Sequence, residues 1–431
     1  MTCLALDPAN PILTMNQTLD YSLPHASLRD DQKTCRKLEL NLRKNRDQDS
    51  TQEIDRLAVQ FDFQTCHDQY WNPEAFSLLF ATPLWESATP DQRVKLNQLY
   101  WVAYYSQIIS AEIATIFFNQ TSAAGLYAVE DFRIVCDILD LESAQERAHI
   151  NAFKTISEAF ELAVFGKRLF TYPMRGPYVA TMLFRNSHRV RDFWRQVQLN
   201  AYSLLSSNNA FIACQYFAVR GVRTLNGKLV QHKLSQFYAR STEKDTSPIP
   251  AQISYYHFLD ESFHFNSSTI ISHDVLTTLP NPTPFEKWVA NRTLQGTQRD
   301  HFHFSTAVNG LFWYDPALFQ NVYEILRSPL FLMTDADARQ MMWRCFAEES
   351  EGLHLSAKSR EIAMESYKEY LADLPYVDQT NREMTIMGRN SVTQHLETNR
   401  KALKAFFREI DFSGFRVQDS EFRGGDSGKR T

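Results

Sequence analysis

The chain has 431 residues, of which 22% are charged and 44% apolar, and its formal net charge is −5. This balance predicts a soluble globular protein with a large core, and it argues against a nucleic-acid binder, which needs clustered Lys and Arg. The small number of glycines, 13, and the 13% of aromatic residues favour helices with bulky cores over glycine-punctuated α/β folds. We therefore expect an all-α fold in one large domain.

The cysteines and the hydropathy pattern indicate the compartment. Six cysteines are dispersed without CxxC spacing, which excludes a zinc ribbon and makes a disulfide framework improbable. The first fifteen residues lack the cationic and apolar regions of a secretory signal. The most apolar stretch, 99–118, contains Gln107, Ser110 and Glu112, so we expect no membrane span. Together these features predict a cytoplasmic protein.

Along the chain, polar residues 1–55 predict a loosely attached N-terminal arm with one short helix. Thr89 as N-cap and Pro90 in the first turn then predict a long helix to about residue 119. The main domain is expected over 56–415, and the Gly-, Ser- and charge-rich tail, 416–431, is expected to be disordered. Further helices are predicted at about 127–139, 142–166, 174–186, 190–222, 250–270, 281–295, 316–328, 334–353 and 357–374.

Three Glu-x-x-His motifs occur where about one would be expected by chance. On a helix, the i, i+3 spacing places a carboxylate and an imidazole on one face, where both can bind the same metal ion. Two such helices and a neighbouring glutamate form a dinuclear iron or manganese site in a four-helix bundle. The motifs are Glu146 with His149, Glu261 with His264, and Glu351 with His354.

The second motif carries an additional histidine. His257 precedes Glu261 by four residues and His264 by seven, so all three side chains project from one stripe of a helix. If buried, they need partners, which a shared metal supplies, whereas the plain alternative is a solvent-facing polar stripe. Glu112 lies in the most apolar helix, where an unpaired carboxylate is costly, so it is expected to be paired, neutral or bound to a cation.

The order Glu112, Glu146-x-x-His149 and His257-x3-Glu261-x2-His264 resembles the ferritin-like di-iron oxygenases related to para-aminobenzoate N-oxygenases. The stretches YWNPEAFSLLFATPLW and FIACQYFAVRGVRTLNGKLVQHKLSQ are most similar to the cyanobacterial dimetal-carboxylate halogenases of the cylindrocyclophane type. The resemblance covers roughly residues 65–310. It implies a ferritin-like four-helix bundle with additional C-terminal helices, and a dinuclear iron site, with manganese as the alternative, held by those six residues.

The chain departs from the N-oxygenase pattern on the third bundle helix, where that family has another glutamate. Between Glu161 and Glu243 the only acidic residue is Asp192, which lies among arginines. The missing carboxylate is expected near Cys214 and Gln215, which are therefore candidates for a halide site, with ordinary core packing as the alternative. Three glutamates against two ferrous ions leave about one positive charge, which an anion such as chloride could balance.

Other candidates are weaker. Glu351 and His354 lie beside Glu348 and Glu349, a pattern typical of a solvated face, although the motif could supply an outside carboxylate. His301 and His303 are either a metal pair or packed rings. Two larger sets of candidates remain. The first is a basic patch, which either docks an anionic carrier or is a solvated helix end. The second is a set of aromatic residues, which either line an acyl tunnel or form core. The patch is Arg220, Arg223, Lys228 and His232; the aromatic set is Tyr104, Tyr105, Phe117, Phe118, Phe211, Tyr216 and Phe217.

The resemblance implies a halogenase that uses O2 and chloride on an unactivated carbon of a fatty acyl chain, free or tethered to an acyl carrier protein, in natural-product biosynthesis. An N-oxygenase or hydroxylase of the same superfamily is the first alternative. A non-catalytic metal-binding or carrier-binding module is the second. A neutral residue in place of the third-helix carboxylate favours the halogenase, because it leaves room for a halide.

Overall fold

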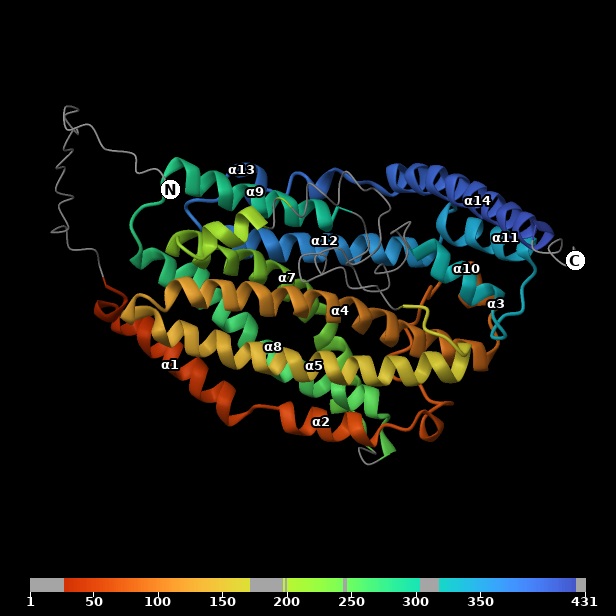
Figure 1. The fold of residues 1–431 in the computed structure, drawn as a ribbon, viewed down its shortest axis with the longest axis horizontal. Helices are drawn as coiled ribbons and strands as arrows, with labels where there is room; N and C mark the ends of the chain where they lie inside the picture. Colours follow the sequence, from red (N-terminus) through yellow and green to blue (C-terminus); the bar gives the residue numbers. More distant parts are fainter. Residues whose placement is uncertain (1–26, 171–196, 198–199, 243–245, 303–317, 424–431) are drawn as a thin grey trace, which may run out of the picture.

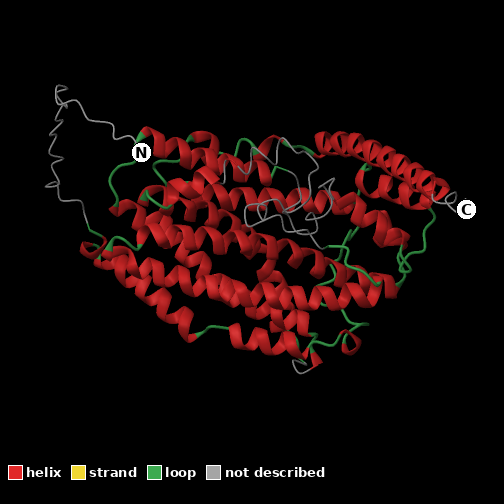
Figure 2. Cartoon of the chain, in the orientation of Figure 1, coloured by secondary structure: helices red, strands yellow, loops and turns green. Residues whose placement is uncertain are grey.

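The computed structural model describes residues 27–170, 197, 200–242, 246–302 and 318–423. Within these ranges the secondary structure is entirely helical, and no strand occurs in the described chain (Figure 2). The prediction of an all-α fold is therefore confirmed. The helix expected at 174–186 and Asp192 lie outside the described residues.

The centre of the molecule is a bundle of four long helices (Figure 1). These are α4 (Pro90–Leu126), α5 (Arg133–Phe165), α7 (Ala210–Ala239) and α8 (Ile249–Thr269). α4 packs against α5 and α7, and α8 packs against α7 and α5, so the four helices form a closed ring. This arrangement is consistent with the predicted ferritin-like bundle.

Local sequence determines where the bundle helices begin. Thr89 and Gln92 form a capping box around Pro90, as expected for the start of α4. The Asn209 side chain accepts a hydrogen bond from the Ile212 backbone N–H at the start of α7. The sequence predicted two helices separated near residue 140, but α5 is one helix through its Asp- and Glu-containing segment. It ends at Phe165, where Gly166, with φ 66°, is the C-cap.

Two N-terminal helices cover one side of the bundle. α1 (Gln32–Asp47) and α2 (Thr51–Gln60) both pack against α5 and α8. From residue 32 onward the structure therefore differs from the loosely attached arm expected up to residue 55. The physical reason is that α1 is buried partly through polar contacts, since Asn45 and Gln145 exchange two hydrogen bonds of 3.2 and 2.8 Å. Such contacts are invisible to a hydropathy pattern.

C-terminal helices cover the opposite side, as expected. α9 (Pro284–Asp300) and α12 (Glu351–Leu371) pack against α7. α14 (Val392–Arg423) extends past the boundary expected at residue 415. The remaining helices are α3 (Pro83–Ser87), α10 (Phe319–Arg327), α11 (Asp335–Phe346) and α13 (Gln379–Arg382).

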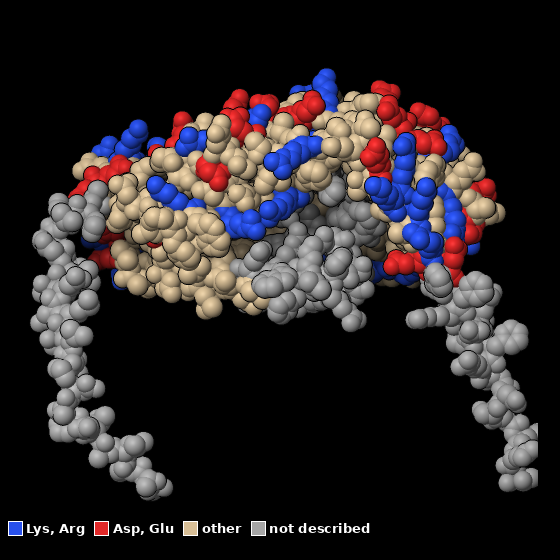
Figure 3. All heavy atoms as spheres, turned by 90° about the horizontal axis from the view of Figure 1, so that it is seen from above, with Lys and Arg blue, Asp and Glu red and all other residues tan. Residues whose placement is uncertain are grey.

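The surface is mixed in charge. On the face shown in Figure 3, acidic and basic side chains are interspersed among broad uncharged areas. None of the described helices is both long enough and apolar enough to cross a bilayer. The apolar segment 99–118 instead lies within α4, whose residues Leu99–Tyr105 are all buried in the core of the bundle.

Candidate metal centre

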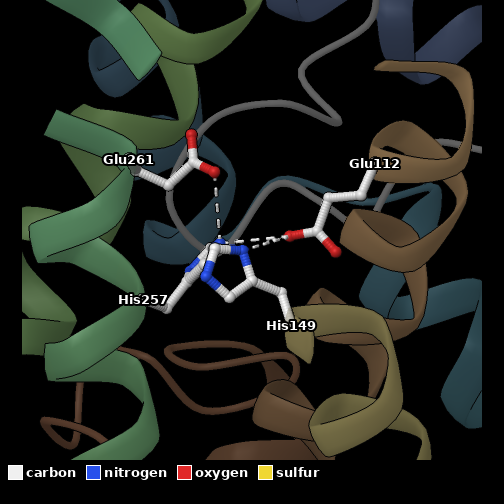
Figure 4. A group of neighbouring side chains, drawn as sticks. All are labelled: Glu112, His149, His257 and Glu261. Atoms are coloured by element: carbon white, nitrogen blue, oxygen red, sulfur yellow. Dashed lines mark hydrogen bonds and ion pairs between the residues drawn. The ribbon is translucent and has the colours of Figure 1, made fainter. Parts of the chain in front are cut away.

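Six carboxylate and imidazole side chains meet in the interior of the bundle. α4 contributes Glu112, α5 contributes Glu146 and His149, and α8 contributes the other three. All six are buried, with exposed fractions of 8% or less. Figure 4 shows four of them, with the two imidazoles between two carboxylates from opposite helices. The six residues singled out in the sequence are thus brought together: Glu112, Glu146, His149, His257, Glu261 and His264.

The first group in this cluster contains two histidines and two glutamates. Glu112 Oε1 lies 3.1 Å from His257 Nε2 and 3.7 Å from His149 Nδ1. Glu261 Oε1 lies 3.5 Å from the same His257 nitrogen. One ligand atom from each of the four residues lies within 4.8 Å of the others, a geometry that could hold a metal ion.

The second group shares Glu261 with the first. His264 Nδ1 lies 3.1 Å from Glu261 Oε1 and 3.4 Å from Glu146 Oε1. The other Glu146 oxygen, Oε2, lies 3.5 Å from His149 Nδ1, so the carboxylate of Glu146 faces a histidine of each group. Two neighbouring groups linked by two carboxylates fit a dimetal site.

Two polar residues hold the histidine rings from outside the cluster. Asp260 Oδ2 accepts a 3.1 Å hydrogen bond from His149 Nε2, and Gln145 Oε1 accepts one of 2.9 Å from His264 Nε2. Each bond leaves the Nδ1 of its ring directed at the carboxylates, an arrangement typical of metal-binding histidines. Sequence reasoning missed both residues, although each directly precedes the glutamate of a motif.

The N-terminal helices support this outer layer. The Ser50 backbone N–H donates a 3.2 Å hydrogen bond to Asp260 Oδ1, and Asn45 pairs with Gln145. Asp260 is fully buried, and its partners come from α5 and from the link between α1 and α2. The segment expected to be an arm therefore positions two residues that orient the histidines.

The protonation balance of the cluster depends on mutual contact. Burial raises the pKa of Glu112 well above its ordinary value. Burial and the Glu261 carboxylate act to raise the pKa of Glu146, but the nearby imidazoles of His264 and His149 outweigh them, so the net pKa is lowered. Burial lowers the pKa of His149, but its bonds to Asp260 and Glu146 outweigh this effect and raise it to about 9. Positive charge on the imidazoles thus stabilises the carboxylates.

Several atoms of the cluster lack hydrogen-bond partners among the described residues. Examples are Oε2 of Glu112, Oε2 of Glu146, Nδ1 of His149 and Nδ1 of His257, all of them buried. A buried polar atom without a partner is costly, and a buried charge even more so. Bound cations would supply partners for the carboxylate oxygens and for His149 Nδ1, so the residues present fit a metal centre.

A second buried network lies one helical turn from the cluster. Arg220 forms an ion pair of 2.7 Å with Glu142 and donates hydrogen bonds to Asn119, to Ser268 and to the His264 carbonyl. Its partners come from α4, α5 and α8, so one side chain from α7 connects all four bundle helices. Arg220 is neither part of an exposed docking patch nor a solvated helix end, because its guanidinium is fully paired inside the bundle.

Two other members of that predicted patch, Lys228 and the exposed His232, contact a neighbouring helix. The Lys228 ammonium lies 4.6 Å from the centre of the Phe265 ring, and the His232 ring packs against Phe258 at 5.5 Å. Both side chains therefore contact α8, the neighbouring helix of the bundle.

The structure does not bring Cys214 and Gln215 to the cluster. Gln215 donates to the Tyr202 hydroxyl at 3.1 Å and accepts from Thr293 of α9, while Cys214 is buried in a core of apolar side chains. Both precede Arg220 on α7, whereas the cluster lies beyond Arg220. The prediction therefore placed the halide site at a turn of α7 that does not face the cluster. Sequence spacing alone does not determine which turn of α7 faces the carboxylates.

The weaker candidates fall outside the cluster. His354 is exposed and pairs with Glu349 at 3.4 Å, so the third motif lies on the surface. His301 is buried, its Nδ1 bonds to the Thr297 carbonyl, and its ring packs against Tyr367; His303 lies outside the described residues. In the aromatic set all but Phe117 are buried in the two apolar cores: Tyr104, Tyr105, Phe118, Phe211, Tyr216 and Phe217.

The fold and the cluster define a helical-bundle protein with a buried carboxylate–histidine centre that fits two metal ions. A family model described as acyl halogenase, CylC-like, matches residues 33–407. The chain therefore belongs to the CylC-like acyl halogenase family, which confirms the resemblance to these halogenases. Comparisons with curated proteins and with solved structures find no significant match.

Proposed function

We propose that this protein is a dimetal halogenase that uses O2 and chloride to replace an unactivated C–H bond of a fatty acyl chain by C–Cl. The observation that carries the proposal is a buried dinuclear-type cluster, in a chain of the acyl halogenase family, to which α7 contributes no carboxylate among its described side chains. Both Glu-x-x-His motifs of the bundle are intact, which argues against a non-catalytic module.

In this proposal the metals are iron, with manganese as the alternative, since mixed carboxylate and imidazole ligands suit both. Glu112, His149, His257 and Glu261 would hold one ion, and Glu146, Glu261 and His264 would hold the other. When bound, two ferrous ions would supply two electrons. Conversion of R–H and chloride to R–Cl and a proton releases two more, and these four electrons together reduce one O2 to two waters.

The protein's own side chains orient the ligands and exclude water. Asp260 keeps the proton of His149 on Nε2 and thereby directs Nδ1 at the carboxylates. Aromatic rings cover His257, with Phe153 at 4.9 Å and Tyr105 at 5.7 Å between ring centres. The Tyr105 hydroxyl is itself held by a 3.0 Å hydrogen bond to Ser254, which fixes the position of this ring. Such an aromatic wall would help to keep water from a reactive carbon centre.

The ligand assignment is tested by counting bound metal. Reconstitution of the purified protein with ferrous iron under anaerobic conditions should give about two ions per chain. His264→Ala should retain about one ion, whereas Glu261→Ala should reduce binding of both because both groups share this carboxylate. Full binding by the Glu146→Ala, His264→Ala double variant would reject the assignment, and His354→Ala, on the surface, is the matched control.

The acyl substrate is proposed to enter from the end of the bundle. A pocket of about 950 Å³ lies there, lined by residues that include Tyr70, His232, Lys233, Arg240 and Ala251. His232 directly follows Gln231, which lies in the interior of the bundle. The two exposed cations of the pocket, Lys233 and Arg240, suit an anionic carrier. The double variant Lys233→Glu, Arg240→Glu should raise the KM for a carrier-linked acyl substrate. Lys154→Glu, which changes an exposed side chain on α5, should not.

The reaction class is tested by mass spectrometry of fatty acyl substrates, free and linked to an acyl carrier protein. The reduced protein is incubated with O2 and either chloride or no halide. Chlorine isotope doublets that require chloride are the expected result. Products that carry only added oxygen would establish a hydroxylase or N-oxygenase instead, and unchanged substrate in every arm would favour the binding module.

A further inference from the structure

Helix α7 faces the cluster but contributes none of the metal-type ligands found among the described residues. Residues at positions 220, 227 and 231 of α7 share one face, because they are seven and four positions apart. Arg220 on this face contacts the other three bundle helices, so the face points into the bundle. Gly227 and Gln231 therefore point inward as well.

Gly227 lies at the level of the cluster. On α7 it falls between Arg220, which contacts Asn119 of α4, and Gln231, which lies near Tyr104 of α4. Glu112 falls between the same two α4 residues, at the level of the two metal-type groups. Gly227, which has no side chain, thus lies on α7 between the two contacts that bracket Glu112 on α4.

The space beside Gly227 would accept a side-chain atom without a clash. A Cβ atom added there would meet only the Gln231 side chain, at 3.7 Å from Nε2 and 3.9 Å from Cδ, which is ordinary contact. Packing therefore does not require glycine at this point of the helix, where glycine is unfavourable. The Tyr104 hydroxyl and the Gln231 side chain are buried and interact with each other, but neither the hydroxyl nor Gln231 Oε1 has a hydrogen bond of good geometry among the described residues.

Charge is distributed unequally between the two groups. Asp260 is a fourth carboxylate, which the count of three glutamates omitted, so the total charge alone does not demand an anion. However, Asp260 and Glu112 both contact His149, whereas His264 contacts Glu146 and Glu261. The outer partner of His264 is the neutral Gln145, so this group has no counterpart to the Asp260 carboxylate.

We propose that Gly227 leaves a halide subsite on the α7 side of the cluster, where the Tyr104 hydroxyl and the Gln231 amide donate hydrogen bonds to the anion. This inference rests on the proposed halogenase function and assigns the halide to a position two turns beyond Arg220. The absence of a side chain at 227 provides the room that a carboxylate would otherwise fill. Because Tyr104 and Gln231 offer hydrogen-bond donors to this room, the group that occupies it is a hydrogen-bond acceptor.

The subsite is tested by titrating cobalt-substituted protein with chloride and with bromide while its visible spectrum is recorded. Wild-type protein should show a saturable spectral shift, and Gly227→Ala, which adds only a methyl group, should show it too. Gly227→Glu should bind two metal ions per chain but show no shift, because its carboxylate fills the position. Tyr104→Phe and Gln231→Leu should bind halide more weakly, with unchanged metal content.

The outcomes separate this subsite from the proposed function. If Gly227→Glu binds two metals and still responds to halide as the wild type does, or if the wild type does not respond, the subsite is wrong. If Gly227→Glu loses metal, Gly227→Gln, which fills the same space without charge, takes its place in the titration with the same expected result. If the wild type responds to halide but forms no chlorinated product, the subsite stands and the halogenase function fails.

Discussion

At the scale of single residues, Asp260 illustrates how a side chain outside the metal-type cluster can control it. It is fully buried, accepts hydrogen bonds from His149 and from the Ser50 backbone, and directly precedes Glu261. A carboxylate in this position fixes both the tautomer and the orientation of the imidazole. Gln145 does the same for His264 without a charge, so the two histidines that Glu146 faces differ in the strength of their support.

We predict that Asp260→Asn lowers metal affinity by about 10- to 100-fold, because the amide cannot stabilise the imidazole as a carboxylate does. The measurement is competition for ferrous or cobalt ions against a chelator of known affinity. Asp274→Asn is the matched control, since its carboxylate pairs with Lys37 at the surface and touches no histidine of the cluster. Equal affinities of Asp260→Asn and wild type would show that the tautomer is fixed elsewhere.

At the scale of elements, the four bundle helices are held together both by the cluster and by Arg220. The cluster joins α4, α5 and α8, and Arg220 connects α7 to all three. Since α7 provides no carboxylate to the cluster among its described residues, the guanidinium is its polar connection to the centre. This connection also orders the segment of α8 that bears His264, through the His264 carbonyl.

We predict that Arg220→Leu destabilises the protein by about 3–5 kcal/mol, because it leaves Glu142 buried without its partner. The double variant Arg220→Leu, Glu142→Leu should recover part of that loss, since both charges are removed together. Urea unfolding monitored by circular dichroism measures both effects. Arg56→Leu, which breaks an exposed ion pair with Glu53 on α2, should cost only about 0–1 kcal/mol. A single-variant cost as small as this control would contradict the assignment.

At the scale of the whole molecule, the cluster gathers buried charges from three helices, and metal binding should stabilise the fold. We predict that removing metal with a chelator lowers the midpoint of thermal unfolding, and that adding metal back restores it. A ligand at about 100 times its Kd stabilises the native state by about 2.7 kcal/mol. The Glu146→Ala, His264→Ala variant should show a smaller response, and a wild-type midpoint independent of metal would contradict the prediction.

The composition and spacing of the sequence were sufficient to predict the all-α class and the start of α4 after Thr89, and the resemblance to the halogenases implied the six residues that meet in the bundle. The reason is that helix periodicity and i, i+3 or i, i+4 spacing act within one helix, where sequence position determines which face a side chain occupies. The motifs at Glu146 and Glu261 therefore carried their geometry with them.

Only the tertiary structure decided which turns of different helices lie at the same level. It showed that Arg220 is buried against Glu142, that Asp260 and Gln145 hold the histidines, and that Cys214 and Gln215 pack away from the cluster. The relative shift of neighbouring helices depends on side-chain packing between them, which spacing along one helix does not encode. For the same reason, the polar burial of α1 became visible only in the folded chain.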